Sequence, residues 1–397
     1  MILKQVKKVL KEGTHRAKSL HETLSLLENV YQKAGITRVA DITGLDIIGI
    51  PVFTSIRPNA AEGAITVYNG KGHTPELAKI SAIMEGIERY SAEPDSSKIV
   101  RGSYEELSKS YEILNPNELI LPFLRRYSHK EILEWVYGFS LIKNKEILVP
   151  AEAVFHPYKR ENQLFRTNTN GLAAGNVIEE AILHGLLEVI ERDAWSLYEV
   201  EAIEARDLEV DSNGLAKELL KKFERANIKV YIKEITSDIE IPTIAVALDD
   251  EKTKDPALLS LGVGCHLIPE IALIRALTEA AQSRLTTIHG TREDTYKAGF
   301  ARIIGYERMK RLNRKWFERA ERSIKLSEIK LFESQDFLED INYILKKLKE
   351  VGLNEVIIVD LTRKELNVPA VRVIVPGLEV YALDRDRVGR RCRRRIS

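Results

Sequence analysis

The stretch "AILHGLLEVIERDAW", residues 181–195, carries two glutamates and an arginine at a spacing that places them on one side of a helix. A second stretch, "AKISAIMEGIERYSA" at residues 78–92, repeats the same Glu-x-x-Glu-Arg in the same register after an alanine. A third, "PEIALIRALTEAAQSR" at residues 269–284, keeps the shared pattern E-x-A-x6-E-x-x-[EQ] with glutamine at its last position. Each copy follows a glycine-bearing turn, so the sequence predicts a strand–glycine turn–helix unit that occurs three times.

These units, near residues 63–92, 167–198 and 257–288, alternate with further strands and helices, which is typical of an α/β or mixed α+β fold. Duplicated units of this kind are expected to surround a shared centre. No Gly/Ser-rich or Pro-rich linker interrupts the chain, and we therefore expect one compact body.

The predicted organisation has three parts: an N-terminal helical arm (residues 1–36), a catalytic domain (37–380) and an arginine-rich C-terminal tail (381–397). An amphipathic helix is expected over residues 15–34 because its apolar positions follow the helical period. The segment "VPAVRVIV" at residues 368–375 is expected to form an edge strand close to the end of the domain.

Composition excludes several classes of protein. A formal net charge of +1 over 397 residues lacks the basic excess of a nucleic-acid binder. No apolar run approaches the roughly 20 residues of a membrane span, and no signal peptide is evident, so a cytoplasmic protein is expected. Cys265 and Cys392 are too few for a disulfide framework or a multi-cysteine zinc site. We expect Cys265 to be a small buried hydrophobe and Cys392 to be an exposed thiol.

Seven arginines lie within residues 384–397. A run of like charges is usually solvated, so we expect a mobile tail, with contact to an acidic partner as the alternative.

The repeated glutamates predict a site. Glu85 and Glu88 lie roughly 60° apart on a helix that turns about 100° per residue, and Glu188 and Glu191 repeat this arrangement. The plain alternative is a solvated acidic stripe held by Glu–Arg pairs. Apolar residues border the carboxylates in both copies, and small residues beside them would let a ligand approach closely. The repetition therefore favours a site over a solvated stripe.

The chemistry of that site follows from its charge. Several carboxylates that converge cannot all remain ionised without cations. Oxygen ligands without His or Cys favour Mg²⁺ over zinc or copper, and Mg²⁺ held by carboxylates usually also binds phosphate. The pattern therefore predicts a nucleotide with Mg²⁺.

A known phosphate-binding motif is not evident elsewhere. The stretch "GAITVYNGKGHT" (63–74) lacks the G-x4-G-K-[ST] spacing of a P-loop, and kinase motifs and a G-x-S-x-G elbow are missing. A Ser–His–Asp or Cys–His site stays open at this point, because such sites are recognised by geometry.

Four ordered segments resemble the YcaO family: "GITRVADITGLDIIGIPVFTSIRPN", "GKGHTPELAKISAIMEGIERYSAE", "NGLAAGNVIEEAILHGLLEVIERDAW" and "ALTEAAQSRL". The resemblance runs from about residue 13 to residue 379. It implies an enzyme that binds ATP and Mg²⁺ between glutamate-bearing helices and phosphorylates the oxygen of a peptide backbone amide. Some members then cyclise Cys, Ser or Thr side chains to azolines, whereas others take sulfide from outside and leave a thioamide.

The same resemblance implies roles for individual residues. The carboxylates that it assigns to Mg–ATP are Glu85, Glu88, Glu188 and Glu191, with Glu180 as a further ligand. The nucleotide contacts that it assigns are Ser81, Asn176, Arg192, Gln282 and Arg284. Weaker candidates for contacts to phosphate or peptide are Arg16, Arg38 and Arg57, for which structural ion pairs are the alternative. The residues with a candidate catalytic role are Arg38, Arg57 and Arg192.

The branch of the family follows from what the sequence lacks. Azoline-forming members generally have a fused or partner domain for a leader peptide and a C-terminus rich in alternating prolines, and neither pattern occurs in this sequence. It is more similar to the archaeal type that works with a TfuA-like partner and converts a glycine of methyl-coenzyme M reductase to thioglycine with external sulfide. Azoline synthesis and a non-catalytic ATP-binding scaffold remain alternatives, and a homodimer is allowed.

Overall fold

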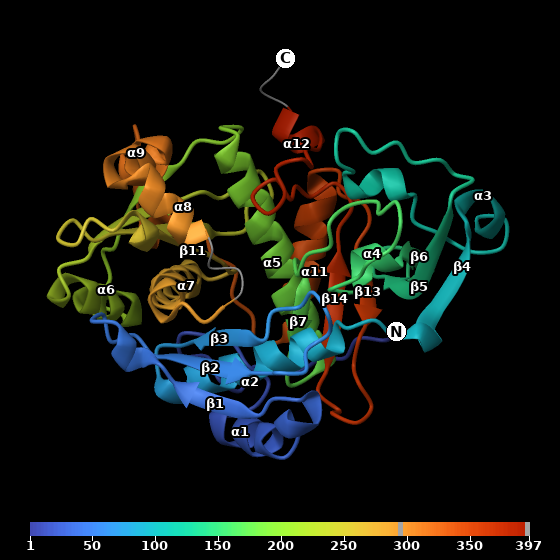
Figure 1. Ribbon diagram of the computed structural model, residues 1–397, viewed down its shortest axis with the longest axis horizontal. Helices are drawn as coiled ribbons and strands as arrows, with labels where there is room; N and C mark the ends of the chain where they lie inside the picture. The colour runs from blue at the N-terminus through green and yellow to red at the C-terminus, as the bar shows by residue number, and fades with distance from the viewer. Residues whose placement is uncertain (293–296, 394–397) are drawn as a thin grey trace.

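The computed structural model describes residues 1–292 and 297–393, in which three β-sheets and several long helices surround a common centre (Figure 1). The first sheet has the antiparallel order β1-β2-β3 and consists of β1 (Arg38–Asp41), β2 (Val52–Ile56) and β3 (Val67–Lys71). The second has the order β11-β10-β9-β8-β12 and consists of β8 (Arg206–Glu209), β9 (Lys229–Glu234), β10 (Thr243–Asp249), β11 (Ser260–Cys265) and β12 (Ser323–Lys325).

The third sheet has the order β4-β5-β13-β14-β7, with β6 paired to β5. Its strands are β4 (Ile99–Ser103), β5 (Ile132–Ser140), β6 (Lys145–Pro150), β7 (Leu172–Ala174), β13 (Ile357–Asp360) and β14 (Ala370–Ile374). The helices are α1 (Leu20–Glu28), α2 (Pro75–Ser91), α3 (Tyr104–Leu107), α4 (Ala151–Val154), α5 (Ile178–Glu199), α6 (Leu215–Arg225), α7 (Pro269–His289), α8 (Lys297–Ile304), α9 (Tyr306–Leu312), α10 (Arg314–Phe317), α11 (Phe337–Glu350) and α12 (Arg390–Arg393). This mixed arrangement confirms the predicted fold class.

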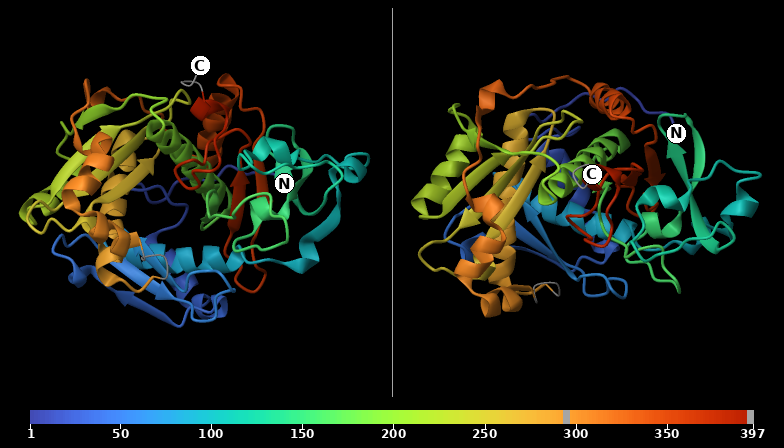
Figure 2. Two further views of the ribbon diagram at one scale, coloured as in Figure 1. Left: turned by 45° about the horizontal axis from the view of Figure 1, so that its top comes forward. Right: turned by 90° about the horizontal axis from the view of Figure 1, so that it is seen from above.

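The three long helices α2, α5 and α7 carry the repeated glutamates, and each packs on the sheet that contains the strand before it. Figure 2 shows α6, α8 and α9 at one end of the molecule and the β4–β6 region at the other, with α5 between them. No helix within the described residues is long and apolar enough to cross a membrane.

The starts of these helices follow from local chemistry. The side chain of Thr74 accepts a hydrogen bond from the backbone N–H of Leu77, and Pro75 occupies the first turn of α2. Proline suits the first turn because it lacks an N–H that would otherwise need a partner. Helix α7 likewise begins with Pro269 and ends at Gly290, whose φ of 64° suits a residue without a side chain.

Small residues let the helices approach the strands closely. A Cβ on Gly70 of β3 would lie 1.9 Å from the backbone nitrogen of Ala82, and one on Gly262 of β11 would lie 2.2 Å from that of Ala280. These contacts correct one inference from the sequence. Ala78 and Ala82 are small because a strand packs against them, and not because a ligand does.

The N-terminal segment is less helical than predicted. Helix α1 covers only Leu20–Glu28 and is followed by a 3₁₀ turn at Tyr31–Ala34. Ser19 begins α1 through a capping box with Glu22, which fixes the start of the helix after residue 15. Before it, the chain is extended and forms a bridge between Leu10 and Arg16.

The strand β14 is not an edge strand. It lies between β13 and β7, and its residues are buried. Pro369 precedes the strand, and its carbonyl accepts a hydrogen bond from the N–H of Gly175. A proline at the start of a strand removes no ladder hydrogen bond, so it does not restrict the strand to an edge.

The C-terminal arginines are not a solvated tail up to residue 393. Arg391 is 6% exposed and donates two hydrogen bonds of 2.9 Å to Asp193 of α5, which is itself fully buried. Arg391 also contacts Asp238. Cys392, expected to be exposed, is 2% exposed, and its N–H donates to Glu379. Residues 394–397 lie outside the described part of the chain.

Candidate active site

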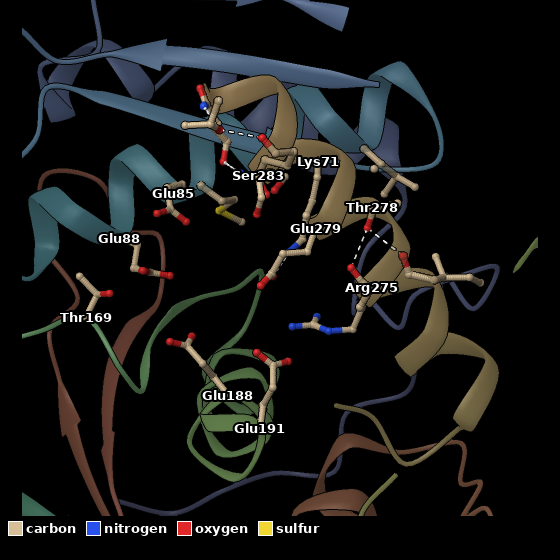
Figure 3. Close-up of a pocket in the computed structure, with 18 of the residues that line it drawn as sticks. Lys71, Glu85, Glu88, Thr169, Glu188, Glu191, Arg275, Thr278, Glu279 and Ser283 are labelled. Atoms are coloured by element: carbon tan, nitrogen blue, oxygen red, sulfur yellow. Dashed lines mark hydrogen bonds and ion pairs between the residues drawn. The ribbon is translucent and has the colours of Figure 1, made fainter. Parts of the chain in front are cut away.

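A cavity of about 700 Å³ lies where α2, α5 and α7 meet. Figure 3 shows Glu85 and Glu88 of α2, Glu188 and Glu191 of α5, and Glu279 of α7 projecting into it from different sides. The shared register explains the arrangement, because each helix presents the same positions of the repeat to the same space. The repeat therefore builds one acidic cavity from three distant segments of the chain.

The repeat also places different chemistry at one shared position. Ser81, His184 and Arg275 lie four residues before Glu85, Glu188 and Glu279 respectively, and all three line the cavity. The three copies thus contribute a hydroxyl, an imidazole and a guanidinium. Burial lowers the pKa of His184 well below its usual range, and the charges of Arg275 and Arg16 add to this, so the imidazole is neutral.

Two arginines separate the carboxylates. Arg89 donates from Nη2 to Glu85 Oε1 at 2.5 Å, and its Nη1 lies 3.2 Å from Glu88 Oε1. Arg192, at the equivalent position of the second copy, lies 3.4 Å from Glu191 and 3.8 Å from Glu279. These pairs compensate part of the repulsion among the acidic groups, and the rest of the repulsion remains.

Three carboxyl groups that line the cavity have raised pKa values. Burial raises the pKa of Glu191 to about 7, and Glu279 contributes to the rise. Burial also raises the pKa values of Glu88 and Glu188, and Glu85 contributes to both. The cavity without a ligand therefore holds protons that a cation would displace.

Glu279 behaves differently. Burial would raise its pKa, but Lys71 and Arg192 outweigh burial and hold the pKa below its usual range. Lys71 reaches Glu279 from the end of β3, which is a strand and not a phosphate loop. This agrees with the rejection of a P-loop at this segment.

Arg275 is a cation for which the described residues supply no hydrogen-bond or ion-pair partner. Its guanidinium lines the cavity, and its buried Nε has no hydrogen-bond acceptor. No ion pair to Arg275 is present within residues 1–292 and 297–393. Arg275 is half-buried and its Nε is shielded from water, so its place beside an acidic cavity favours an anionic ligand.

The acidic groups fit Mg²⁺ only together with a second ligand. In the described part of the chain, no three His, Cys, Asp or Glu side chains are close enough to hold a metal ion by themselves. Mg²⁺ is usually bound by one or two carboxylates with phosphates and water, not by an all-protein cage. Facing carboxylates with raised pKa values and the unpaired Arg275 fit Mg²⁺ that arrives with a polyphosphate.

Most of the residues predicted for the site line this cavity: Arg16, Ser81, Glu85, Glu88, Asn176, Glu180, Glu188, Glu191, Arg192 and Gln282. Glu180 also holds the N-terminal segment to α5. Its Oε2 accepts a hydrogen bond of 2.8 Å from the N–H of Ala17, and Asn176 donates to both of its oxygens. A metal-ligand role for Glu180 stays a prediction.

Three of the predicted arginines do not line this cavity, and ligand contacts from them stay predictions. Arg57 is 2% exposed and donates to the carbonyl of Ala34 and to Glu93, both at 2.7 Å. Arg284 pairs with Asp46 and Asp250. Arg38 is exposed on β1 and does not line the cavity. Arg57 therefore forms the structural ion pair that was the alternative for it.

Sequence reasoning passed over several cavity residues, namely Lys71, Arg89, Thr169, His184 and Arg275. A signal for three of them was present in the repeat. Arg89 corresponds to Arg192, and His184 and Arg275 correspond to Ser81. Lys71 and Thr169 lie outside the helices, where the repeat gives no register.

The raised pKa of Glu191 predicts a pH-dependent stability of the ligand-free protein. A carboxyl whose folded pKa is raised contributes stability that is fully present below its unfolded pKa, near 4.5, and is lost as pH rises through about 7. Each pKa unit corresponds to about 1.4 kcal/mol, so this amounts to a few kcal/mol. We expect Glu191→Gln to flatten the fall in Tm between pH 5 and pH 8, measured by calorimetry with EDTA present. The exposed Glu76→Gln should keep the wild-type slope, and equal slopes in all three proteins would contradict the assignment.

Comparison with known proteins agrees with this geometry. The family model described as "YcaO cyclodehydratase, ATP- and Mg²⁺-binding" matches residues 69–379. The chain is 50% identical over 382 residues to a protein of Methanothermobacter thermautotrophicus, covering 94% of this chain and 98% of that protein. It is 30% identical over 382 residues to a protein in the tfuA 3′ region of Rhizobium leguminosarum bv. trifolii, covering 92% and 89%.

Among solved structures, the chain is similar to YcaO from Methanopyrus kandleri bound with AMPPCP and Mg²⁺. The TM-score is 0.82 at 32% sequence identity, over 97% of this chain and 98% of that one. The matched family region contains all three carboxylate helices, α2, α5 and α7. The chain therefore belongs to the YcaO family.

Proposed function

We propose that the protein uses ATP and Mg²⁺ to activate a peptide backbone amide and exchanges its oxygen for sulfur from external sulfide. The observation that supports the use of ATP and Mg²⁺ is the facing set of carboxylates beside Arg275, which has no partner among the described residues. The overall exchange balances as peptide amide, hydrosulfide and ATP giving peptide thioamide, ADP and phosphate. The hydrogen of hydrosulfide leaves with the phosphate.

Bound Mg–ATP would supply a phosphoryl group that turns the amide oxygen, a poor leaving group, into phosphate. Glu88 of α2 and Glu188 of α5 face one another across the cavity and would hold the cation between the two helices. Arg275 and Arg192 would orient the phosphates, because a guanidinium fork matches phosphate oxygens. Positioning and fixed charge account for most of the catalysis of phosphoryl transfer.

His184 is a polar side chain on the wall of the cavity. It is neutral, so one ring nitrogen is a donor and the other is an acceptor. Its acceptor nitrogen can receive a hydrogen bond from a bound ligand, whereas the lowered pKa makes the ring a weak base. The two cysteines are buried, and burial raises the pKa of the Cys265 thiol to about 12, so neither is suited to carry sulfur.

The choice of thioamide over azoline rests on the sequence and on one relative. The relative at 30% identity lies in a tfuA region, which supports a TfuA-like partner for this chain. The substrate that we propose is a glycine of the methyl-coenzyme M reductase alpha subunit. Azoline formation is the second candidate, because the family model is described as a cyclodehydratase.

We expect turnover to produce ADP and orthophosphate in equal amounts, because the proposed route transfers the terminal phosphoryl group. Phosphorus NMR of a reaction with peptide, sulfide and partner would measure the products. Formation of AMP and pyrophosphate would exclude this route.

Intact-mass spectrometry of the peptide tests the outcome of the reaction. Replacement of oxygen by sulfur raises the peptide mass by about 16 Da, whereas azoline formation lowers it by about 18 Da, and both differ from the rise that stable phosphorylation would cause. The reaction should require ATP, Mg²⁺ and sulfide together. A loss of water without any need for sulfide would favour the cyclodehydratase, and an unchanged peptide mass with no ATP turnover would favour a binding scaffold.

A further inference from the structure

A second cavity, of about 70 Å³, lies beside β14 and the segment that leads into β7. A cavity needs roughly 10–15 Å³ to hold one water molecule, so this one admits a small ion with a few waters and excludes a nucleotide. Its lining includes Arg372, Arg387, Phe165, Asn168 and Asn170. None of these residues belongs to the carboxylate helices.

Arg372 is 4% exposed and has no carboxylate within ion-pair distance among the described residues. Its Nε donates to the carbonyl of Ala153 and its Nη2 to the carbonyl of Asn168, both at 2.8 Å. Its Nη1 is buried and has no partner. The carbonyls therefore fix the guanidinium and leave one donor group open.

Arg387 repeats this arrangement on the other side of the cavity lining. It is 5% exposed, its Nε and Nη2 donate to the carbonyls of Ile120 and Leu119, and its guanidinium lies 4.0 Å from the ring centre of Phe165. It has no ion pair within residues 1–292 and 297–393. Glu118 is the acidic residue of the lining, and it is exposed, so water screens its charge.

Neither guanidinium has a carboxylate within ion-pair distance among the described residues, although Glu188 and Glu88 act on Arg372 from farther away, as Asp384 and Glu379 do on Arg387. This arrangement favours an anion. A charge taken out of water is costly unless an opposite charge accompanies it, and neutral carbonyls offset only part of that cost. The carboxamide oxygen of Asn168 accepts the N–H of Asn170 at 3.0 Å, which leaves its Nδ2 as a further donor. The lining is therefore rich in donors.

The small cavity adjoins the large one. Thr169 lines the large cavity, whereas its neighbours Asn168 and Asn170 line the small one. Helix α5 is shared in the same way, because Glu188 faces the large cavity and Val189 faces the small one. The two cavities are therefore lined by neighbouring residues of the same two segments.

We propose that the small cavity is a binding site for a small monovalent anion, and that its ligand is the hydrosulfide consumed in the reaction. The assignment of hydrosulfide rests on the proposed function, whereas the anion site rests on the two buried arginines. Hydrosulfide fits the volume and the charge of the small cavity, and this position would hold it next to the carboxylate cavity, beside two cations.

Bromide is a suitable probe because its anomalous scattering locates it directly. Crystals of the full chain soaked in sodium bromide should show a peak in the cavity at Arg372 and Arg387. Hydrosulfide added to the soak should lower this peak. No bromide in the cavity would overturn the anion site, and displacement by phosphate but not by hydrosulfide would overturn the assignment of the ligand. Neither result depends on thioamide formation. Failure of the anion site can therefore be distinguished from failure of the proposed function.

Kinetics tests the same assignment. Arg387→Lys should raise the KM for sulfide about tenfold, because lysine cannot keep both carbonyl contacts and still present a planar donor. The affinity for Mg–ATP should stay within about twofold of wild type. Arg385→Lys, an exposed neighbour, is the matched control and should leave both values unchanged.

If Arg387→Lys does not fold, Asn168→Ala removes a donor from the lining and should weaken the bromide peak. An unchanged sulfide KM in the folded Arg387→Lys protein, or an undiminished bromide peak in Asn168→Ala where that variant is used, would overturn the proposal.

Discussion

Replacing Glu188 with glutamine is expected to remove most of the thermal stabilisation by Mg–ATP and to leave the ligand-free protein at least as stable as wild type. The described structure gives the Glu188 carboxylate no hydrogen bond and no ion pair. Burial and neighbouring carboxylates raise its pKa, so the charged form is disfavoured before a ligand binds. Glutamine removes this repulsion and keeps the volume of the side chain.

The same substitution should weaken ligand binding, although it does not weaken the ligand-free fold. Loss of one ligand charge should weaken Mg–ATP by about 100-fold or more. At a ligand concentration of about 100 times the wild-type Kd, the stabilisation should fall from about 2.7 to about 0.4 kcal/mol. Differential scanning calorimetry with and without Mg–ATP measures both quantities on one sample.

Two glutamates of the same repeat provide controls. Glu279 pairs with Lys71 and Arg192, so Glu279→Gln should lower the Tm of the ligand-free protein, where Glu188→Gln does not. Glu76 lies on α2 but is exposed, so Glu76→Gln should change neither Tm nor ligand stabilisation beyond a few tenths of a kcal/mol. Normal Mg–ATP stabilisation in Glu188→Gln would contradict the site.

Replacing Arg391 with alanine is expected to destabilise the fold by about 3–5 kcal/mol, because it leaves Asp193 buried without its partner. Asp193 is fully buried on α5, directly after Arg192, and two hydrogen bonds of 2.9 Å join it to Arg391. Even so, burial raises the pKa of Asp193 to about 6, with Arg391 opposing the rise. Urea denaturation at pH 8 would measure the loss.

The same pair predicts a pH dependence. Without Arg391, the pKa of Asp193 should rise further, so protonation below about pH 6 should recover part of the lost stability. Arg390→Ala is the matched control, since the neighbouring Arg390 is exposed and should cost little. Equal stability of the Arg391→Ala and Arg390→Ala proteins at pH 8 would show that the C-terminal segment does not anchor α5.

The repeated register made the carboxylate helices predictable. A pattern of E-x-A-x6-E-x-x-[EQ] fixes which residues share a helix face, so placing the three copies around one centre needs only the helical period. The groups that the arginines contact could not be predicted from the helical period. Whether Arg57 or Arg284 reaches a ligand or an internal carboxylate depends on strands and loops that are distant in sequence.

The C-terminal arginines show the same limit. Composition treats "RRCRRR" as one solvated run. In the structure, exposed Arg390 and Arg393 flank buried Arg391 and Cys392, as a short helix with one inner face requires. The partner that draws Arg391 inward, Asp193, lies almost 200 residues away, and no local pattern identifies it.

Anomalous diffraction from crystals of the full chain with AMPPCP and Mn²⁺ in place of Mg²⁺ tests the central claim most directly. The account predicts manganese peaks beside the carboxylates of α2 and α5, with the phosphates within hydrogen-bond distance of Arg275. Nucleotide bound outside the cavity, or manganese without contact to Glu88 or Glu188, would contradict it.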